Sequence, residues 1–411
     1  MTENGKKEEQ ATNRFIRSIR LRNLLSFGPD SEEIKLEPLN VLIGPNASGK
    51  SNFIEAISLL KAAPVDIIKP FLEGEGHVQE WVWNRTEEPA NAEIEVTAHY
   101  PEGRTVLRHA LGFRFAEKVG LEITSERIEP EHRGRGYFYK NDGGGPVHLK
   151  FRPEGKGRAG DGGGRELRTI SRAEISTQQS ILSQRRDPDQ FPEITYLGEE
   201  FRRIQLFRKW QMGPDSPARK HQATDLPGDF LLEDASNLAR IIDSLRFSRG
   251  LRDDIHKHLA KFADHMIEVT TKMDFGTASV YVEERGGHPI SARRLSDGTL
   301  RYLCLLVILC HPEPPPLICI EEPELGLHPD MIGEIAELLV EASKRTQLIV
   351  TTHSEILVSA LSETPEFILV CEQDAGGTKM RRLKKDRLKK WLERYSLGDL
   401  WRKGVVGGNR W

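Results

Sequence analysis

The chain has 411 residues, 37 % of them hydrophobic, which is enough for two domains or for one large core with an insertion. Its opening stretch, MTENGKKEEQATN, is polar and has no apolar h-region, so residues 1–13 are predicted to be a disordered lead-in and not a secretory signal. The longest apolar run, around Leu303 to Cys310, is far shorter than the roughly 20 residues that cross a bilayer. These features exclude a membrane segment and predict a cytoplasmic protein.

The net charge of −3 conceals an uneven distribution of charge. Segment 376–411 holds about a dozen Lys and Arg against three acids, and it fits either a contact with a phosphate backbone or a solvated basic helix. The cysteines stand singly within apolar runs and never as CxxC, which argues against a zinc site and a disulfide framework. We expect them to be small core side chains: Cys304, Cys310, Cys319 and Cys371.

The first elements are predicted in the order strand, loop, helix. Phe15 to Arg22 alternates apolar and basic residues, and two short β-type runs follow at Ile34 to Leu36 and Leu39 to Ile43. After a glycine-rich loop, the stretch SNFIEAISLLKAA has a helical spacing of apolar residues that ends at Pro64. From about Ala92 to Ile128, β-type runs broken by turns predict an antiparallel sheet.

The middle of the chain changes character twice. Between Glu129 and about Ser171, two glycine triplets predict a flexible loop or hairpin. It contains the basic residues Arg133, Arg135, Lys150, Arg152, Lys156 and Arg158. From about Phe191 to Thr271 helical patterns dominate, including a second helix near Ile255 to Ile267. The first of these helices has an apolar face formed by Leu238, Ile241, Ile242 and Leu245.

An alternation of helices and strands then returns, almost three hundred residues after the glycine-rich loop. One nucleotide-binding domain is therefore predicted to be interrupted by an inserted lobe. The returning elements are a helix from Thr299 to Leu309, a strand from Leu317 to Ile320, a helix from Met331 to Lys344, and strands from Leu348 to Thr352 and Phe367 to Cys371.

The glycine-rich loop has the pattern of a phosphate-binding loop. Gly44 to Ser51 matches G-x-x-x-x-G-K-S between a predicted strand and a predicted helix. Its glycines let backbone N–H groups converge on phosphate oxygens, Lys50 is expected to neutralise the β and γ phosphates, and Ser51 to bind Mg²⁺. The alternative is a glycine turn with an incidental lysine. The predicted nucleotide contacts are Gly44, Pro45, Asn46, Ala47, Ser48, Gly49, Lys50, Ser51 and Asn52.

Two acidic residues end the strand in PPLICIEEPELGLHP. Adjacent side chains at a strand end point in different directions, so Glu321 is expected to hold the metal through water while Glu322 activates the attacking water. A solvated acidic turn is the alternative. The stretch LIVTTHS places His353 just past another strand end, where it could contact a γ-phosphate or the attacking water, although a lone histidine is usually structural.

The stretch RRLSDGTLRYLCLLVIL supplies a second anion site. Ser296, Asp297 and Gly298 stand at the start of an apolar helix, whose first amides are free to bind an anion. One nucleotide needs one phosphate cradle, so two cradles suggest two chains that complete each other's sites. An ordinary helix cap is the alternative.

Together, these stretches resemble the ABC-type ATPase heads of the SMC, RecF and OLD-like families. In that resemblance GPNASGKS is Walker A, LSDGT the signature, LICIEE Walker B, PELGLHP the D-loop and TTHS the switch histidine. ADLPGDFLLEDASNLARII and the terminal WLERYSLGDLW also resemble short bacterial AAA-type (AAA_21-like) ATP-binding proteins, which are often grouped with antiphage or DNA-maintenance genes. In the D-loop, Glu324 departs from the transporter pattern and agrees with the RecF-like form.

The resemblance implies an α/β fold, namely an ABC-ATPase head (a P-loop NTPase) with an N-terminal antiparallel β lobe, a RecA-like core completed by the C-terminal segment, and an inserted helical lobe. Such heads carry a glutamine loop that contacts the metal, and Gln179 is our choice, with Gln178, Gln184 and Gln79 left open. The expected regions are an N-terminal ATPase lobe at 14–130, a Gly-rich basic insertion at 131–172, the glutamine loop and helical lobe at 173–290, the remaining motifs at 291–375 and a basic tail at 376–411.

The resemblance also implies a function. Two heads would sandwich ATP with Mg²⁺, and the resulting homodimer would bind or sense DNA and control an effector, plausibly in antiphage defence or DNA maintenance. Only 58 residues follow His353, too few for a Toprim nuclease, so any nuclease or Toprim-like effector is expected on another chain, encoded nearby. The alternative is a regulatory scaffold that restrains a protein partner without touching DNA. A transporter ATPase or a small-molecule kinase fits the motifs less well.

Overall fold

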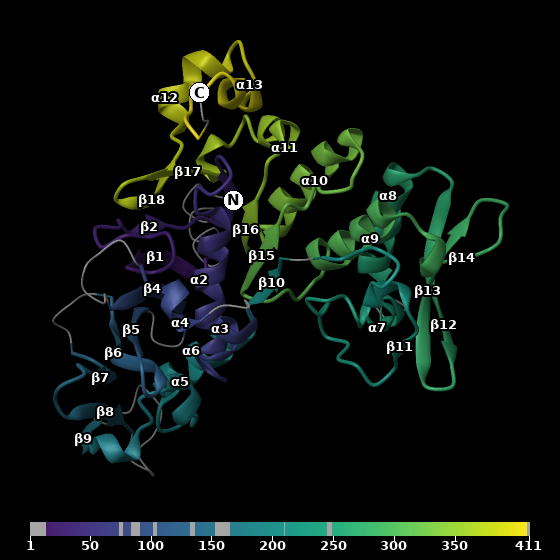
Figure 1. Cartoon of the computed structure of the whole chain (residues 1–411). Coiled ribbons are helices and arrows are strands. Elements are labelled where there is room, and N and C mark those ends of the chain that lie inside the picture. Colours follow the sequence, from purple (N-terminus) through teal and green to yellow (C-terminus); the bar gives the residue numbers. More distant parts are fainter. Residues whose placement is uncertain are drawn as a thin grey trace.

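The computed structural model describes residues 14–73, 77–83, 91–101, 105–131, 136–152, 165–208, 210–244 and 249–408. Figure 1 shows two parts side by side, with the two larger sheets in one and a helical lobe with a smaller sheet, β11 to β14, in the other. Within the described residues, no helix is both long and apolar enough to cross a membrane.

The core sheet brings together strands from both ends of the chain. It has six strands in the order β10-β15-β16-β3-β17-β18, and only the last pair is antiparallel. Their bounds are β10 Gln205–Phe207, β15 Leu317–Glu321, β16 Gln347–Thr351, β3 Leu39–Ile43, β17 Ile368–Asp374 and β18 Gly377–Arg382. Strand β3 therefore lies between two strands that follow it by about three hundred residues, as the interrupted-domain prediction requires.

Both faces of this sheet are buried, because alternate residues of its strands enter two different cores. In β15, Ile318 and Ile320 pack with the helical lobe, whereas Leu317 and Cys319 pack with the antiparallel sheet. A strand buried on both faces must be apolar throughout, as LICI is. The cysteines Cys304, Cys319 and Cys371 are buried and Cys310 is half-buried, which confirms them as small core side chains.

The second sheet is antiparallel, with strand order β2-β1-β4-β5-β6-β7-β8-β9. Its strands are β1 Ile16–Arg22, β2 Ile34–Lys35, β4 Ala92–Tyr100, β5 Thr105–Ala116, β6 Gly120–Pro130, β7 Tyr139–Asn141, β8 Val147–Phe151 and β9 Glu166–Ile170. The Gly-rich basic segment thus supplies three strands to this sheet, and its first glycine triplet forms the β7–β8 turn. The second triplet and Arg133, Arg135, Lys156 and Arg158 lie outside the described residues.

Short helices connect this sheet to the core. The helix after the phosphate loop, α2, packs against α6. The helices on this side are α2 Lys50–Ala62, α3 Lys69–Glu73, α4 Val78–Trp81, α5 Ile181–Gln184 and α6 Pro192–Arg202.

The helical lobe contains a β-hairpin that the sequence reading missed. The predicted helix to Ile267 ends at Phe262, and the chain turns at Phe275 and Gly276, whose φ angles are 38° and 80°. Two successive positive φ angles match a two-residue hairpin turn, although Phe is an unusual residue there. The lobe consists of α7 Leu238–Ser244, α8 Arg249–Phe262, α9 Asp297–Leu309, β11 Gln222–Ala223, β12 Met266–Asp274, β13 Thr277–Glu284 and β14 Ile290–Ser291. Leu245, expected on the face of the first helix, lies outside the described residues.

The C-terminal segment folds back onto the core. Helix α13 packs against α11, and its Trp401 side chain is buried. The side chain of Trp391 is 47 % exposed, because α12 packs mainly through Leu388. The helices are α10 Pro329–Ala342, α11 Glu355–Ala360, α12 Lys385–Leu392 and α13 Leu397–Arg402.

Candidate nucleotide-binding site

The phosphate loop leaves the carboxyl end of β3 and enters α2 through Gly49. Gly49 has a φ of 96°, and a Cβ there would lie 2.2 Å from Oγ1 of Thr378 on β18, so only glycine fits. Gly44 is equally confined, because its Cβ would lie 2.3 Å from the carbonyl oxygen of Cys371. The tip of the loop, Asn46 and Ala47, is exposed, as is Ser51 in the first turn of α2.

Lys50 is folded back on its own loop. Its Nζ donates to the carbonyl oxygens of Gly44 at 2.8 Å and Pro45 at 3.0 Å. Burial lowers the pKa of Lys50, and the nearby Glu322 carboxylate opposes that shift. These carbonyls are weak partners for an ammonium group, so a phosphate placed in the loop would compete well for it.

Two features of the loop are suited to an anion. The Ser48 hydroxyl is buried and has no hydrogen-bond partner among the described residues. No side chain caps the N-terminus of α2, so its first amides remain available. A buried polar group without a partner is costly, and phosphate oxygens would satisfy both features. The residues present therefore fit a nucleotide phosphate.

Strand register brings the predicted carboxylates to the same edge of the sheet as the phosphate loop. Glu321 on β15 pairs with Thr351 on β16, and Thr351 in turn pairs with Leu42 on β3. Glu322 follows with a φ of 46°, and its N–H donates to the Thr351 carbonyl at 3.0 Å. This left-handed conformation, uncommon for a residue other than glycine, sets the direction of Glu322 apart from that of Glu321.

Arg208 holds Glu321, a contact that the sequence reading missed. Its Nε lies 3.3 Å from Oε1 of Glu321, and its Nη2 lies 3.6 Å from Oε2 of Glu55 on α2. Burial raises the pKa of Glu321, and the guanidinium of Arg208 opposes that shift. Arg208 directly follows β10, so the pairing of β10 with β15 puts it beside Glu321. Only the tertiary pairing reveals this contact.

His353 faces Glu322 across the site. Its Nε2 lies 3.9 Å from Oε1 of Glu322. The pKa of His353 is lowered, first by burial and then by the positive charge of Lys50, so the ring is neutral at neutral pH. Glu324 fixes the histidine loop, because its Oε1 accepts from the Thr352 hydroxyl at 2.6 Å and from the His353 N–H at 3.0 Å.

The predicted signature residues form an exposed helix cap. The Ser296 hydroxyl accepts from the Thr299 N–H at 3.0 Å, so the capping role expected as the alternative is present. Ser296 and Asp297 are exposed. A Cβ on Gly298 would lie 2.5 Å from the Gly326 carbonyl, which places this cap against the D-loop of the same chain.

The structure does not bring Gln179 to the phosphate loop. Leu182, three residues further on, lies beside Gly198 and Pro64, just past the C-terminal end of α2. Helix α2 has 13 residues and is therefore about 20 Å long, with Lys50 at its opposite end. Gln179 is exposed there, and the choice of this residue as nucleotide and metal contact is corrected. The chain that leaves the core sheet beside Glu321 is the segment starting at Arg208.

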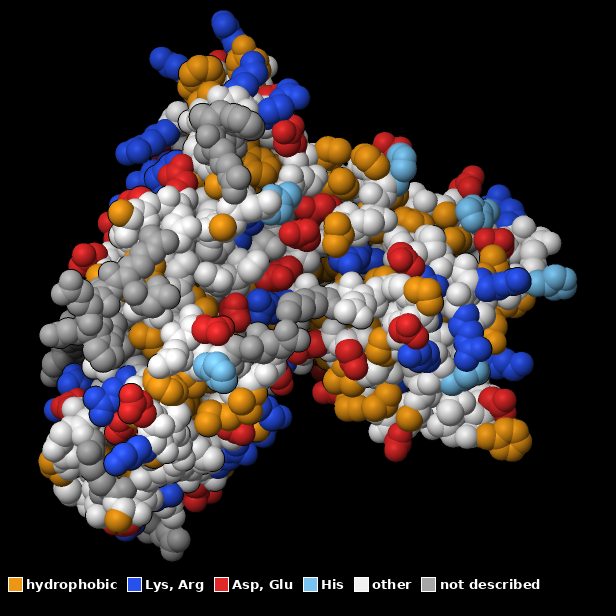
Figure 2. All heavy atoms as spheres, viewed as in Figure 1, with side chains coloured by type: hydrophobic (Ala, Val, Ile, Leu, Met, Phe, Trp, Pro, Cys, Tyr) orange, Lys and Arg blue, Asp and Glu red, His pale blue; other side chains and the backbone are white. Residues whose placement is uncertain are grey.

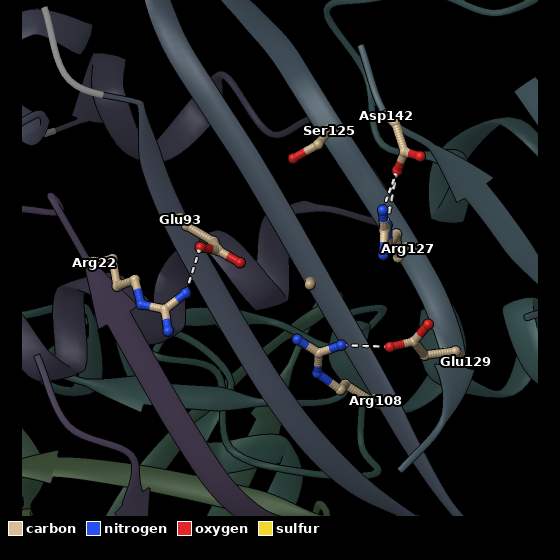
Figure 3. Close-up of a pocket in the computed structure, with 8 residues that line it drawn as sticks. Arg22, Glu93, Arg108, Ser125, Arg127, Glu129 and Asp142 are labelled. Atoms are coloured by element: carbon tan, nitrogen blue, oxygen red, sulfur yellow. Dashed lines mark hydrogen bonds and ion pairs between the residues drawn. The ribbon is translucent and has the colours of Figure 1, made fainter. Parts of the chain in front are cut away.

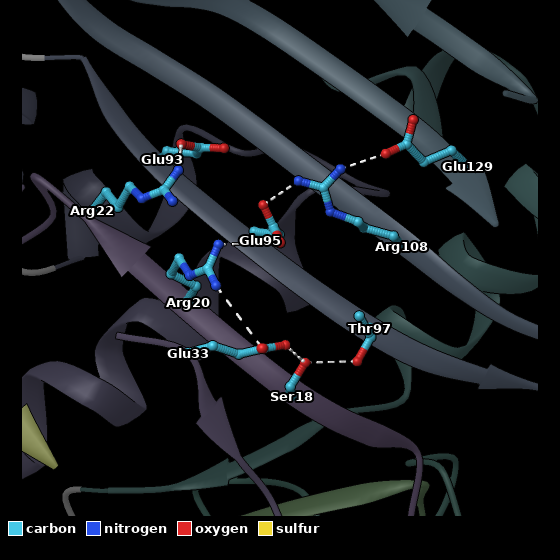
Figure 4. A network of polar contacts seen from close by, with 9 residues as sticks. All are labelled: Ser18, Arg20, Arg22, Glu33, Glu93, Glu95, Thr97, Arg108 and Glu129. Atoms are coloured by element: carbon cyan, nitrogen blue, oxygen red, sulfur yellow. Dashed lines mark hydrogen bonds and ion pairs between the residues drawn. The ribbon is translucent and has the colours of Figure 1, made fainter. Parts of the chain in front are cut away.

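A polar hollow, with a volume of about 670 Å³, lies on the antiparallel sheet, away from the phosphate loop (Figure 3). Its floor includes the small residues Ala110 and Ser125, and its arginines are paired with carboxylates. The pairs are Arg22 with Glu93 at 3.1 Å, Arg127 with Asp142 at 2.6 Å, and Arg108 with Glu129. The pairing continues over the neighbouring strands, where Arg108 also meets Glu95, and Arg20 lies between Glu95 and Glu33 (Figure 4).

The fold is shared with solved heads of SMC proteins. An SMC head bound to the C-winged helix domain of ScpA matches 91 % of this chain and 99 % of its own, with 15 % identity and a TM-score of 0.56. An Smc head with an extended coiled coil, bound to the C-terminal domain of ScpA from Pyrococcus furiosus, matches 92 % of this chain and 98 % of its own, with 15 % identity and a TM-score of 0.52. The architecture is therefore that of an ABC/SMC-type P-loop ATPase head, as predicted.

A family model matches the sequence over a shorter part of the chain than the solved structures do. The chain belongs to the AAA_21 family, described as "AAA domain, putative AbiEii toxin, Type IV TA system", which matches residues 39–359. It is therefore an AAA-family protein with the fold of an ABC/SMC-type ATPase head, and the resemblance expected from its four motifs is confirmed.

Proposed function

We propose that this chain binds and hydrolyses ATP with Mg²⁺, dimerises around the nucleotide, and uses this switch to bind or sense DNA and to control an effector protein. The observation that carries the ATPase part is the shared sheet edge at which the phosphate loop, Glu321, Glu322 and His353 meet. An antiphage or DNA-maintenance role is part of the same proposal.

The chemistry follows from these contacts. Lys50 exchanges its two loop carbonyls for phosphate oxygens, and the Ser48 hydroxyl gains its missing partner. Ser51 and Glu321 would hold Mg²⁺, which neutralises the charge that develops on the phosphates. Glu322 orients the attacking water and accepts its proton. His353, being neutral, donates a hydrogen bond to the γ-phosphate or to that water.

Exposed apolar side chains beside the site support a dimer. Leu325 is 55 % exposed three residues after Glu322, and Ile356 is 44 % exposed three residues after His353. Exposed apolar residues that adjoin a polar site favour an interface that closes over it. A second copy would cover them while presenting Ser296 and Asp297 to the nucleotide. Each site would then be complete only in the dimer.

The C-terminal helices support contact with DNA. Figure 2 shows Lys and Arg side chains gathered around these helices at the top of the molecule. The exposed basic residues of this region are Lys384, Lys385, Arg387, Lys389, Lys390, Arg394, Arg402 and Lys403. Trp391 and Tyr395 are exposed among them, and an exposed aromatic ring is able to stack on a base. We expect the resulting DNA affinity to fall as the salt concentration rises.

The effector is proposed to be a separate chain, such as a nuclease or Toprim-like protein encoded nearby. Among the residues that the structure describes, no group of three or more His, Cys, Asp or Glu side chains is arranged to hold a metal ion. A scaffold that restrains a protein partner without touching DNA is the second candidate. It is favoured by the solved SMC heads of the same fold, which are bound to ScpA domains.

Size analysis of Glu322→Gln with ATP tests the proposal. We expect the variant to bind ATP and to accumulate as a dimer, because the nucleotide stays in place when its hydrolysis is blocked. The same measurement with added duplex DNA, and then with the product of a neighbouring gene, separates the DNA and scaffold readings. A variant that binds ATP and remains monomeric would contradict the proposed dimer.

A further inference from the structure

The segment Leu295–Thr299, here called the signature segment, is exposed where it would meet a partner. Ser296 and Asp297 face solvent, whereas Leu295 is only 7 % exposed. Fixing one flexible residue costs about 1–2 kcal/mol of conformational entropy, so a surface segment binds a ligand tightly only when it is held in place beforehand. The Ser296 cap holds the helical side of this segment but not the residues that precede it.

Arg219 supplies that missing support. It lies in the 3-10 turn Pro217–Arg219 and is itself 7 % exposed. Its Nη1 donates to the carbonyl oxygens of Ala292 at 2.9 Å and Leu295 at 2.7 Å, and its Nη2 donates to Oδ1 of Asp297 at 2.5 Å. A planar guanidinium with five N–H donors is able to satisfy such a set, whereas a lysine ammonium has three donors and no fixed plane.

Arg219 also compensates a charge. Asp297 is 65 % exposed at the N-terminus of α9, where its carboxylate would repel the phosphates of a nucleotide brought there. The guanidinium of Arg219 balances this carboxylate and draws it toward the interior of the lobe. The helix N-terminus can then attract an anion despite its acidic residue.

The Arg219 side chain also joins the segment that follows Arg208 to the signature segment. Its Nε donates to the Met212 carbonyl at 2.8 Å, and Met212 lies four residues after Arg208, which holds Glu321. The segment that leaves the core sheet at the chain's own site is therefore fastened to the segment that would serve the partner's site.

We propose that Arg219 is a positioning residue for the nucleotide held by a second copy of this chain. It orders the signature segment and neutralises Asp297, and it makes no contribution to the nucleotide site of its own chain. This inference rests on the proposed ATP-dependent dimer.

The test compares nucleotide binding with dimerisation in the Glu322→Gln background. Adding Arg219→Met should leave ATP affinity of the monomer within about twofold and weaken the ATP-dependent dimer by at least about tenfold, because each lost hydrogen bond to a charged group is worth that much. Arg219→Lys, which keeps the charge, should be intermediate. If Arg219→Met dimerised as tightly as the Glu322→Gln parent, the inference about Arg219 would be overturned while the dimer itself would be established. If the Glu322→Gln parent failed to dimerise, that result would instead count against the proposed function.

Arg382→Met is the matched control. Arg382, at the end of β18, is a half-buried arginine that also has three acceptors, the carbonyls of Glu366 and Lys35 and the side chain of Asn40. It should lower the melting temperature without a selective loss of dimer. If both arginine variants lose dimer in proportion to their melting temperatures, Arg219 acts through stability alone and the inference is rejected.

A mixing experiment separates action within one chain from action across the interface. With Glu322 intact, Arg219→Met and Lys50→Ala should each hydrolyse ATP poorly, but their mixture should regain activity. The hybrid dimer has one site with an intact phosphate loop and an intact signature segment. No recovery, in a mixture where Ser296→Arg and Lys50→Ala do recover, would place Arg219 in the chain's own site.

Discussion

The polar hollow on the antiparallel sheet and the nucleotide site at the edge of the core sheet differ in how their charged groups are partnered. On the antiparallel sheet, guanidinium and carboxylate groups alternate across strands and pair with one another. At the edge of the core sheet, the Ser48 hydroxyl is buried without a partner among the described residues, the Lys50 ammonium group contacts carbonyl oxygens of its own loop, and Glu322 has a left-handed backbone. In the sheet hollow each arginine has a carboxylate partner, although Nε of Arg108 makes no hydrogen bond among the described residues. The nucleotide site instead has a hydroxyl and an ammonium group that a phosphate would bind.

In a chain with many charged residues, this difference helps to separate a ligand-binding site from a set of structural ion pairs. The hollow on the sheet is lined by Arg22, Arg108 and Arg127 and by Glu93, Glu129 and Asp142, so its charges balance. A balanced surface offers little to a polyanion, and DNA contact is therefore better sought on the basic C-terminal helices. The left-handed backbone of Glu322 and the Lys50 ammonium group held by loop carbonyls, not the number of charges, distinguish the nucleotide site.

Replacing one carboxylate at the nucleotide site and one in the sheet hollow should give the largest contrast in the rate of ATP hydrolysis. Glu322→Gln should lower the rate of ATP hydrolysis by about 10²- to 10⁴-fold, because it removes the group that accepts the water's proton. Glu129→Gln, in the hollow on the antiparallel sheet, should leave the rate of hydrolysis unchanged at a temperature where the protein is folded. Phosphate release at saturating ATP measures both. Unchanged hydrolysis by Glu322→Gln would remove Glu322 from the catalytic role.

Removing a paired arginine should show that the sheet hollow contributes to stability. Arg108→Met removes the guanidinium that Glu95 and Glu129 share, at a position where all three side chains are largely buried, although Glu95 keeps its contact with Arg20 at 3.8 Å. We expect a loss of about 3 kcal/mol in the free energy of unfolding, because an unpaired buried charge is costly. Urea denaturation measures the loss, and ATP affinity should stay the same. If the free energy of unfolding did not change, water would have to solvate these carboxylates in the variant.

Two serine substitutions provide the finest test of the comparison. Ser18→Ala removes a hydroxyl that contacts Glu33 at 2.5 Å and Thr97 at 2.8 Å, and it should cost about 1 kcal/mol of stability with no change in ATP affinity. Ser48→Ala removes a hydroxyl without a partner, so it should not destabilise the protein but should weaken ATP binding. Calorimetry with and without ATP separates the two effects. If both substitutions changed stability and ATP affinity in the same way, the polar network of the antiparallel sheet and the nucleotide site would not differ in the way proposed.

The local sequence pattern predicted the structure correctly where a single strand, loop or helix is concerned. The strand, glycine loop and helix around Lys50 were predicted almost to the residue, since loop chemistry and helical spacing are local. The hairpin at Phe275 was missed because its alternation resembles the end of an amphipathic helix and its turn has Phe at a position that favours Asn or Gly. Gln179 was misplaced because the choice rested on order along the chain, whereas strand pairing decides which loop leaves the sheet beside Glu321.

The sequence by itself determined the chemistry of this protein: a phosphate loop, two carboxylates after an apolar strand, a histidine after another and a serine-capped helix. Each depends on residues within one short stretch, so each can be recognised without knowing its neighbours. Only the tertiary structure decided which of these groups share a sheet edge, that Arg208 holds Glu321, and that Arg219 supports the segment from Leu295 to Asp297. Those contacts join residues that are far apart in the chain, and strand register and packing, not local pattern, bring them together.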